Sequence, residues 1–279
     1  MYHSDLFKDQ IALITGGRSG IGYAIAKQLL ALGAQVFITS RKEDLLRQAA
    51  EELSKIGPCA YYPCDIRDVE QIARLAEQIE STYGRLDILV NNAGGQFPAL
   101  AENISPNGWN AVINNNMTGT FLMSKQMLLS FFKAQKSGVI VNITANVMRG
   151  FPGMAHSSAA RAAVENLTKT LACEWARFKV RMNAIAPGTI RSSGLDTYPE
   201  PIKMILEGVK DENLMGRLGS VEDISNAVCF LASPLSAYIS GITLQVDGME
   251  HLHSNRMSNF EFLRTITINR FLIKTTYVF

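Results

Sequence analysis

Two groups of residues in this chain have types and spacing that could do chemistry. The first is Thr15-Gly16-Gly17-Arg18-Ser19-Gly20-Ile21-Gly22. Its glycines would let the backbone turn tightly against a phosphate, and a helix after it would offer unpaired N–H groups. The second is Ser157 with Arg161, which share one face of a helix because they are four residues apart. The first group predicts a phosphate site, and the second supplies a hydroxyl and a fixed positive charge suited to an oxyanion.

The elements that must position these groups follow from the hydrophobic pattern. Short apolar runs bounded by turn residues have the length of buried parallel strands, and longer amphipathic segments separate them. This alternation predicts an α/β fold, a single domain with a doubly wound, Rossmann-type parallel sheet of about seven strands and helices on both faces. The predicted strands are 11–15, 35–39, 60–63, 86–91, 138–143, 181–186 and 243–246, and the predicted helices are 22–32, 43–56, 69–83, 109–135, 157–176 and 221–232.

The domain organisation follows from these elements. Residues 1–250 are predicted to form one dinucleotide-binding domain. Within it, about 190–219 lacks a clear period and contains prolines and glycines, which predicts a lid or substrate-binding insertion. Residues 251–279 follow the last predicted strand as a C-terminal extension, which either packs on a partner subunit or is poorly ordered.

The position of the glycine turn indicates a dinucleotide, because it lies directly after the first predicted strand and before a helix. The second predicted strand ends in Thr39-Ser40-Arg41-Lys42, where an acidic residue would bind the ribose of NAD. Together with Arg18, these residues gather three cations and a hydroxyl that suit a 2′-phosphate. The pattern favours NADP(H), and the alternative is a solvated helix start.

Composition excludes several classes of protein. The net charge is +2 with 19% charged residues, so no basic face for nucleic acid is expected. Cys59, Cys64, Cys173 and Cys229 have no metal or redox spacing, so we expect free thiols and no metal site. No apolar run approaches the roughly 18 residues of a membrane span. With no signal peptide at the N-terminus and no peroxisomal address at the C-terminus, a cytoplasmic protein is expected.

Four motifs carry a resemblance to a known family. Thr15–Gly22, Asn91-Asn92-Ala93-Gly94, Asn183-Ala184-Ile185-Ala186-Pro187-Gly188 and Val246-Asp247-Gly248 resemble those of the short-chain dehydrogenase/reductase superfamily. The match covers about residues 8–250. It implies an oxidoreductase that is usually a homotetramer and has a small-molecule substrate.

The resemblance also implies which residues bind the cofactor. Gly16, Arg18, Ser19, Ile21 and Gly22 would hold the pyrophosphate, Ser40, Arg41 and Lys42 the 2′-phosphate, Asp65 and Ile66 the adenine, Asn92, Ala93 and Gly94 the underside, Arg161 the ribose hydroxyls, and Pro187, Gly188, Ile190 and Ser192 the nicotinamide.

The family uses an asparagine, a serine, a tyrosine and a lysine for carbonyl chemistry. The asparagine has a match in Asn116. The serine aligns with Ala145 when the strands are aligned and with Thr144 when positions are counted back from the helix. The tyrosine aligns with Ser157 and the lysine with Arg161. The predicted catalytic residues are therefore Asn116, Thr144, Ser157 and Arg161.

These replacements bear on the reaction. Reducing a ketone leaves an alkoxide that needs a proton, which a tyrosine beside an ammonium group can supply. Ser157 is far less acidic, and Arg161 cannot release a proton. Conjugate reduction of an enoyl thioester places the negative charge on the thioester oxygen instead, where fixed donors stabilise it. The site therefore favours NADPH-dependent reduction of the 2,3 double bond of a trans-2-enoyl-CoA.

A closer resemblance agrees with this reaction. Gly94-Gly95-Gln96-Phe97, Asn107-Gly108-Trp109, Gly150-Phe151-Pro152 and the helix from His156 to Ala176 are similar to the peroxisomal trans-2-enoyl-CoA reductases. The related 2,4-dienoyl-CoA reductases carry a tyrosine on the loop that is Asn146-Val147-Met148-Arg149 here. The alternatives are a 3-oxoacyl or other carbonyl reductase, a 2,4-dienoyl-CoA reductase, and a cofactor-binding regulator or scaffold without chemistry.

Overall fold

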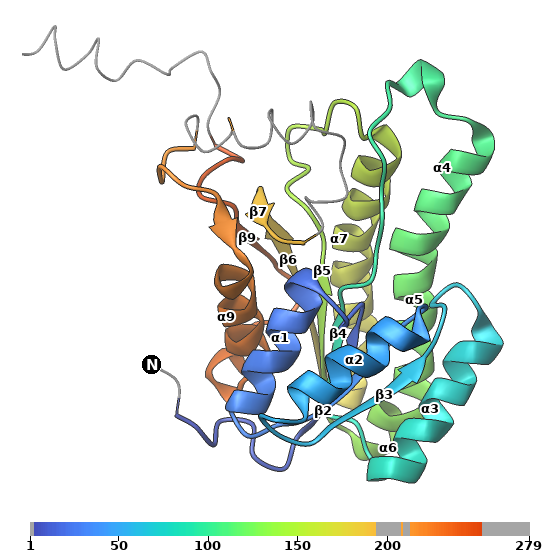
Figure 1. The fold of residues 1–279 in the computed structure, drawn as a ribbon, viewed down its shortest axis with the longest axis vertical. Coiled ribbons are helices and arrows are strands. Elements are labelled where there is room, and N and C mark those ends of the chain that lie inside the picture. Colours follow the sequence, from blue (N-terminus) through green and yellow to red (C-terminus); the bar gives the residue numbers. More distant parts are fainter. Residues whose placement is uncertain (1–2, 194–207, 209–212, 253–279) are drawn as a thin grey trace, which may run out of the picture.

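The fold is built on one parallel sheet, shown in a computed structural model that describes residues 3–193, 208 and 213–252 (Figure 1). The sheet has seven strands in the order β3-β2-β1-β4-β5-β6-β9. The strands are β1 (Ile11–Thr15), β2 (Gln35–Ser40), β3 (Cys59–Pro63), β4 (Ile88–Asn91), β5 (Gly138–Ile143), β6 (Val180–Pro187) and β9 (Thr243–Val246). Every pairing is parallel, as in Ile14 with Ile38 and with Val90. The predicted doubly wound, Rossmann-type sheet is confirmed.

The helices cover both faces of this sheet. They are α1 (Gly20–Ala31), α2 (Glu43–Leu53), α3 (Val69–Tyr83), α4 (Pro106–Ile113), α5 (Gly119–Met127), α6 (Lys133–Gln135), α7 (Ala155–Trp175) and α9 (Val221–Ala232). Short 3-10 turns lie at Ala101–Asn103, Ala176–Phe178 and Pro234–Ser236. α1, α2 and α9 pack on one side of the sheet and α3, α5 and α7 on the other (Figure 1). Each face therefore has its own apolar core.

The helix predicted over 109–135 is one continuous helical segment with two wider turns. Five-residue π turns at Asn114–Thr118 and Leu128–Phe132 connect α4, α5 and α6. Such turns rotate the side chains that follow them and occur often at functional sites.

A second, two-stranded sheet pairs β7 (Ile190–Arg191) with β8 (Gly219–Ser220). The prediction of a lid over 190–219 did not include these strands, because two residues are too few for a visible period. The remainder of that lid, and the extension from 253 onward, lie outside the described residues. In the described part of the chain, no helix has both the length and the apolar character that crossing a bilayer requires.

Hydrogen bonds of two buried asparagines, which we call the chain of amides, connect α5 and α7 to the sheet. Asn91 Nδ2 donates to Ser124 Oγ on α5 and to Asn142 Oδ1, both at 2.8 Å. Asn142 Nδ2 in turn donates to Thr168 Oγ1 on α7 at 2.9 Å. These bonds hold α5 and α7 at the carboxyl ends of β4 and β5.

We expect Asn142→Ala to take one acceptor from Asn91 Nδ2 and one donor from Thr168 Oγ1, both buried. Its free energy of unfolding should fall by about 1–3 kcal/mol, measured by urea denaturation. Asn110→Ala, which changes an exposed asparagine on α4, is the control and should leave the midpoint unchanged. An unchanged midpoint for Asn142→Ala would contradict the role given to this chain of amides.

Candidate functional site

The glycine turn lies where the strand order reverses, between β1 and β4. Gly16 has φ +67, a backbone conformation that favours glycine. A Cβ at Gly22 would meet the carbonyl oxygen of Gly16, and it would lie 2.5 Å from Asn92 Nδ2. Both positions therefore need glycine, and the turn comes close to the helix after it.

The N-terminus of α1 is open to a ligand. Its N-cap residue, Ser19, makes no side-chain hydrogen bond to the first turn. Thr15 Oγ1 accepts the N–H groups of Asn92 at 3.0 Å and of Ala93 at 2.9 Å, which fixes the end of β4 beside the turn. The free N–H groups of the first turn and the helix dipole suit a pyrophosphate.

One groove joins most of the residues predicted to bind the cofactor. Its lining, which we call the switch-point groove, is Gly16, Arg18, Ser19, Gly20, Ile21, Thr39, Ser40, Arg41, Lys42, Cys64, Asp65, Ile66, Asn92, Ala93, Gly94, Asn115, Ser192 and Ser193. Gly22 lies beneath it, packed on Gly16 and Asn92. The predicted residues Arg161, Pro187, Gly188 and Ile190 are not part of this lining.

The end of the groove at β2 carries the features expected for a 2′-phosphate. Arg18, Arg41 and Lys42 all line it. The Ser40 hydroxyl is buried there and has no hydrogen-bond partner among the described residues. Asp65 is bound instead by Arg67, whose hydrogen bonds hold the pKa of this carboxyl below its usual range. Three cations beside a buried hydroxyl fit a phosphate group that accepts hydrogen bonds.

Ser157 is fully buried on the first turn of α7, and its hydroxyl bonds to Gln96. The distance from Ser157 Oγ to Gln96 Oε1 is 2.5 Å. Gln96 lies on the loop after β4, 61 positions away in the chain. In this orientation the hydroxyl donates its proton to Gln96. Turning the amide by half a turn would bring Nε2 to the same place and free that proton for a ligand.

Arg161 lies one turn further along α7 and brings its charge to the same loop. Its Nη1 donates to the Ile143 carbonyl at 2.7 Å, at the end of β5. A Cβ on Gly94 would collide with its Nη2, so the glycine allows this approach. Burial lowers the pKa of Arg161 to about 10, so it stays charged at neutral pH. Among the described residues no carboxylate forms an ion pair with it.

Asn116 reaches the same loop from the first π turn. Its Nδ2 donates to the carbonyl oxygens of Gly95 at 2.7 Å and Val112 at 2.8 Å, and its Oδ1 accepts from the Gly95 N–H at 3.3 Å. Asn116, Ser157 and Arg161 therefore all contact or border residues 94–96. Asn116 fixes the backbone there, Ser157 binds the next side chain, and Arg161 supplies the charge.

Thr144 is directed elsewhere. Both its N–H, at 2.8 Å, and its hydroxyl, at 3.0 Å, donate to the Ile185 carbonyl on β6. The hydroxyl also lies 3.5 Å from Glu165 on α7. Burial raises the pKa of Glu165, and the bond with Thr144 lowers it in part. The structure thus brings three of the four predicted catalytic residues together and places the Thr144 hydroxyl against β6.

His156 is a buried neighbour of the site whose contacts the sequence did not indicate. Its Nδ1 accepts the Ser157 N–H at 2.8 Å, and its ring meets Phe97 edge to face with 4.5 Å between ring centroids. Its Nε2 is buried and finds no hydrogen-bond partner in the part of the chain that the structure describes. With Gln96 on Ser157 and Phe97 on His156, the start of α7 is joined twice to the loop after β4. No local pattern could reveal either pair, because each spans about sixty residues.

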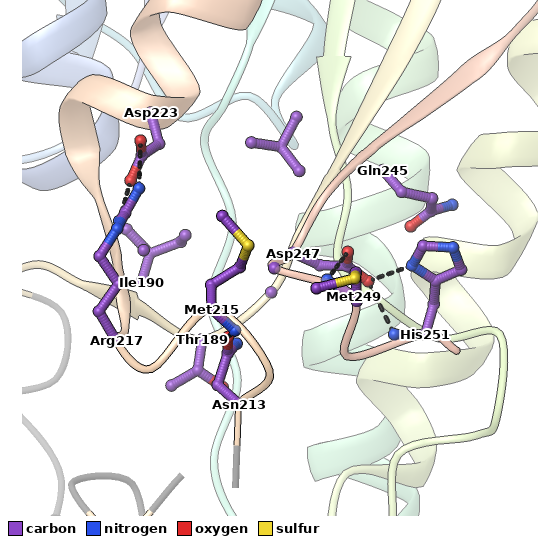
Figure 2. Close-up of a pocket in the computed structure, with 14 residues that line it drawn as sticks. Thr189, Ile190, Asn213, Met215, Arg217, Asp223, Gln245, Asp247, Met249 and His251 are labelled. Carbon is purple, nitrogen blue, oxygen red and sulfur yellow. Dashed lines mark hydrogen bonds and ion pairs between the residues drawn. The ribbon is translucent and has the colours of Figure 1, made fainter. Parts of the chain in front are cut away.

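The residues predicted to face the nicotinamide border a second cavity (Figure 2). Gly188 and Ile190 line it with Asn213, Met215 and the turn after β9. Pro187 ends β6, and its carbonyl accepts the Asn146 N–H at 2.9 Å. Ser192 and Ser193 line the switch-point groove. Residues 188–193 therefore run from one cavity to the other.

Comparison with known proteins identifies the family to which a chain with this groove and these side chains is similar. Residues 16–248 match the family model described as enoyl-(acyl carrier protein) reductase. A Bacillus subtilis (strain 168) protein named probable 2,4-dienoyl-CoA reductase [(2E)-enoyl-CoA-producing] is 38% identical over 86% of this chain and 96% of its own length. The rat peroxisomal 2,4-dienoyl-CoA reductase [(3E)-enoyl-CoA-producing] is 37% identical over 89% of this chain and 86% of its own.

A solved structure leads to the same family. The citronellol catabolism dehydrogenase AtuB of Pseudomonas aeruginosa PAO1 superposes with a TM-score of 0.79 and is 37% identical, covering 89% of this chain and 97% of that one. The resemblance carried by the four sequence motifs is thereby confirmed. The chain belongs to the short-chain dehydrogenase/reductase family of oxidoreductases, which use nicotinamide cofactors.

Proposed function

We propose that the protein reduces the 2,3 double bond of a trans-2-enoyl-CoA with NADPH. The observation that carries this proposal is the pairing of a buried Ser157 hydroxyl, held by Gln96, with a partly buried Arg161 that has no carboxylate partner among the described residues. These two side chains can stabilise negative charge on an oxygen. Ser157, which stands where the family has a tyrosine, is not acidic enough to protonate an alkoxide.

The cofactor choice rests on the β2 end of the switch-point groove. Arg18, Arg41, Lys42 and the unpartnered Ser40 hydroxyl suit a 2′-phosphate, and the uncapped α1 suits the pyrophosphate. When bound, the nicotinamide supplies the hydride that the β-carbon of the substrate receives.

The residues of this chain would act on the developing charge. Ser157, with its proton turned away from Gln96, would donate to the thioester oxygen as it becomes an enolate oxygen. The positive charge of Arg161 would attract the same negative charge, and the low dielectric constant of the protein interior would strengthen this attraction. Asn116 would keep Gly95, and with it the neighbouring Gln96, in place through its two bonds to the Gly95 backbone. Solvent would then protonate the α-carbon.

Reduction of a 2,4-dienoyl-CoA is the second candidate, favoured by the names of the relatives. A dienoyl thioester can carry the same charge on the same oxygen, so the oxyanion argument applies equally. The loop after β5, however, offers Asn146-Val147-Met148-Arg149 and therefore no phenol.

A substrate comparison tests the proposal. Consumption of NADPH should be followed with a trans-2-enoyl-CoA, a 2,4-dienoyl-CoA and a 3-oxoacyl-CoA of equal chain length. Turnover of the enoyl-CoA is expected. Faster turnover of the dienoyl-CoA would favour the second candidate, and turnover of the 3-oxoacyl-CoA alone would overturn both. NADPH binding with no turnover of any of them would indicate a regulator or scaffold.

The cofactor choice has its own test in Arg41→Ala. Loss of one charge-assisted contact to the 2′-phosphate should lower the ratio of kcat/KM with NADPH to that with NADH by about 10- to 100-fold. Arg47→Ala, which removes an exposed arginine of α2 outside the groove, is the control. An unchanged ratio for Arg41→Ala would contradict the assignment of NADPH.

We also propose the homotetramer that the family resemblance implies. Leu235 and Tyr238 expose their apolar side chains, at 65% and 105%, just before the edge strand β9. Exposed apolar groups beside an open sheet edge support association of copies.

A further inference from the structure

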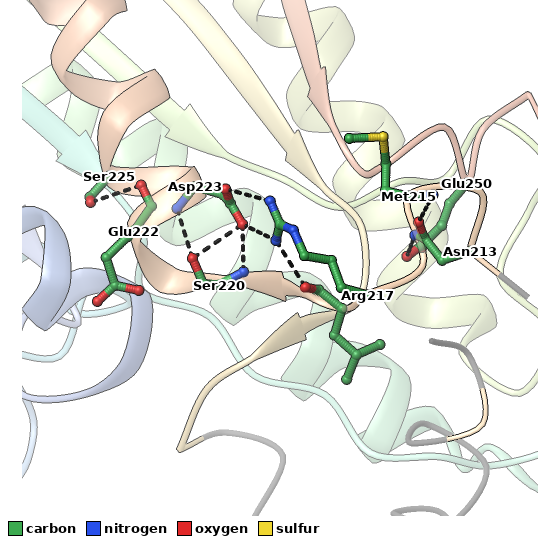
Figure 3. A network of polar contacts seen from close by, with 9 residues as sticks. Asn213, Met215, Arg217, Ser220, Glu222, Asp223, Ser225 and Glu250 are labelled. Carbon is green, nitrogen blue, oxygen red and sulfur yellow. Dashed lines mark hydrogen bonds and ion pairs between the residues drawn. The ribbon is translucent and has the colours of Figure 1, made fainter. Parts of the chain in front are cut away.

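The turn after β9 joins two segments that border the second cavity (Figures 2 and 3). Glu250 is the residue that connects them. Its Oε1 and Oε2 accept the Thr189 N–H at 3.0 and 3.1 Å, and Oε2 also accepts the Thr189 hydroxyl at 3.3 Å. On its other side, Oε1 accepts Asn213 Nδ2 at 3.4 Å. One carboxylate therefore receives four contacts from residues 189 and 213.

The turn that carries Glu250 is built to aim it. Asp247 accepts the N–H groups of Met249 at 3.1 Å and His251 at 2.9 Å, and its Oδ2 lies 2.7 Å from His251 Nδ1. Gly248 has φ +59, and a Cβ there would lie 2.7 Å from Asn213 Nδ2. A substituted residue would push Asn213 away from Glu250, so the glycine keeps these two side chains together.

Burial affects the titration of Glu250. Glu250 is partly buried, and its burial, together with the charge of Asp247, raises its pKa above the usual value for glutamate. A raised pKa means that folding favours the protonated acid. Its contribution to stability is therefore present below the ordinary pKa and is lost as the pH rises through the raised one. The hydrogen bonds of Glu250 give it a second role, because both of its oxygens act as acceptors for Thr189 and Asn213.

That geometry bears on the residues next to Thr189. Gly188 is packed so closely on Asp247 that a Cβ would lie 2.7 Å from the Asp247 Cα. Thr189 also accepts the Gly219 N–H at 3.0 Å, which continues into the β7–β8 pair. The backbone from 188 to 190 is thereby held from both sides. This is the segment that the family resemblance places beside the nicotinamide.

We infer that Glu250 is a positioning residue: it holds the Thr189 backbone, and with it Gly188 and Ile190, in the orientation that faces the nicotinamide end of the cofactor. The inference rests on the proposed function of that segment and does not depend on which acyl substrate is used. Glutamine at 250 would present one acceptor and one donor to three donors, so a donor would face Thr189 or Asn213. Alanine would remove every contact.

The test compares Glu250→Gln and Glu250→Ala with Glu222→Gln in the full chain. Glu222 is the matched control, because its carboxylate is exposed at the start of α9 and accepts no hydrogen bond from the described residues; only its backbone carbonyl accepts one, from Ser225 (Figure 3). NADPH is titrated without substrate, and both the Kd and the emission of the bound nicotinamide are recorded. For both Glu250 variants the Kd should change by less than about threefold, whereas kcat should fall by about 10- to 100-fold, as expected for a displaced reacting group.

The emission separates this inference from the proposed reaction. Bound nicotinamide should lose part of its emission enhancement in both Glu250 variants and keep it in Glu222→Gln, even if no acyl-CoA is turned over. Wild-type emission and wild-type kcat in either Glu250 variant would overturn the inference. A shift of the urea midpoint with unchanged emission and unchanged kcat per folded molecule would also overturn it, because Glu250 would then be structural only.

Discussion

Replacing Arg161 with methionine is expected to lower kcat/KM for enoyl-thioester reduction by about 100- to 1,000-fold. Methionine fills a similar volume with apolar atoms, so the change removes a charge more than it removes packing. In the folded protein Arg161 is partly buried, has no carboxylate partner among the residues that the structure describes, and is held by the Ile143 carbonyl. A cation kept in that state has lost hydration, and a developing oxyanion restores an electrostatic partner to it.

Arg181→Met is the matched control for this change. Arg181 is also a partly buried arginine, and its guanidinium donates to backbone carbonyls that include Leu231 at 2.9 Å and Ile239 at 3.2 Å. Burial lowers its pKa as well. Its loss should reduce stability while activity per folded molecule stays unchanged. Initial rates of NADPH oxidation, scaled by the folded fraction, distinguish the two variants. Equal effects would mean that Arg161 acts only on folding.

The parts of the fold that could be predicted are those with local signals. The apolar runs at Ile11–Thr15 and Gly138–Ile143 are long enough to identify buried strands, and both are strands with those bounds. The glycine turn could also be predicted from the sequence. Only glycine allows the tight backbone turn and the close approach of the turn to the helix after it, and glycine is identified residue by residue. β7 and β8 were missed because two residues carry no period.

The site contacts could be predicted only in part, since they join distant segments. Ser157 and Arg161 share a helix face, so their spacing was sufficient. The partners are different: Ser157 meets Gln96, and Glu250 meets Thr189, each across 61 positions. Thr144 aligns with the family's serine when positions are counted back from the helix, yet its hydroxyl donates to the Ile185 carbonyl on β6. A residue type gives the chemistry available, while packing decides where it points.

Replacing Ser157 with alanine should lower kcat by about 100-fold, which corresponds to the loss of one oxyanion donor. Ser157 is buried and its only side-chain partner among the described residues is Gln96, so alanine removes the hydroxyl with little change of volume. Gln96→Ala should give a similar loss. The double variant should be no worse than either single one, because residues that act as a unit are not additive.

Ser158→Ala controls for the loss of a hydroxyl on the same turn of α7, since Ser158 makes no side-chain hydrogen bond to the described residues. It should keep full activity. Additive losses for Ser157→Ala and Gln96→Ala would separate the two side chains and contradict the orienting role of the amide.

A further experiment introduces the tyrosine and lysine that are typical of the family in place of Ser157 and Arg161. Ser157→Tyr with Arg161→Lys restores an acid and a releasable proton, which a ketone reductase needs and an oxyanion site does not. Ser157 is 0% exposed, so the ring must displace Gln96 from its place. Enoyl reduction should therefore fall in the double variant. A large gain in enoyl reduction would mean that protonation by this side chain limits the reaction, and the oxyanion role of Ser157 would have to be abandoned.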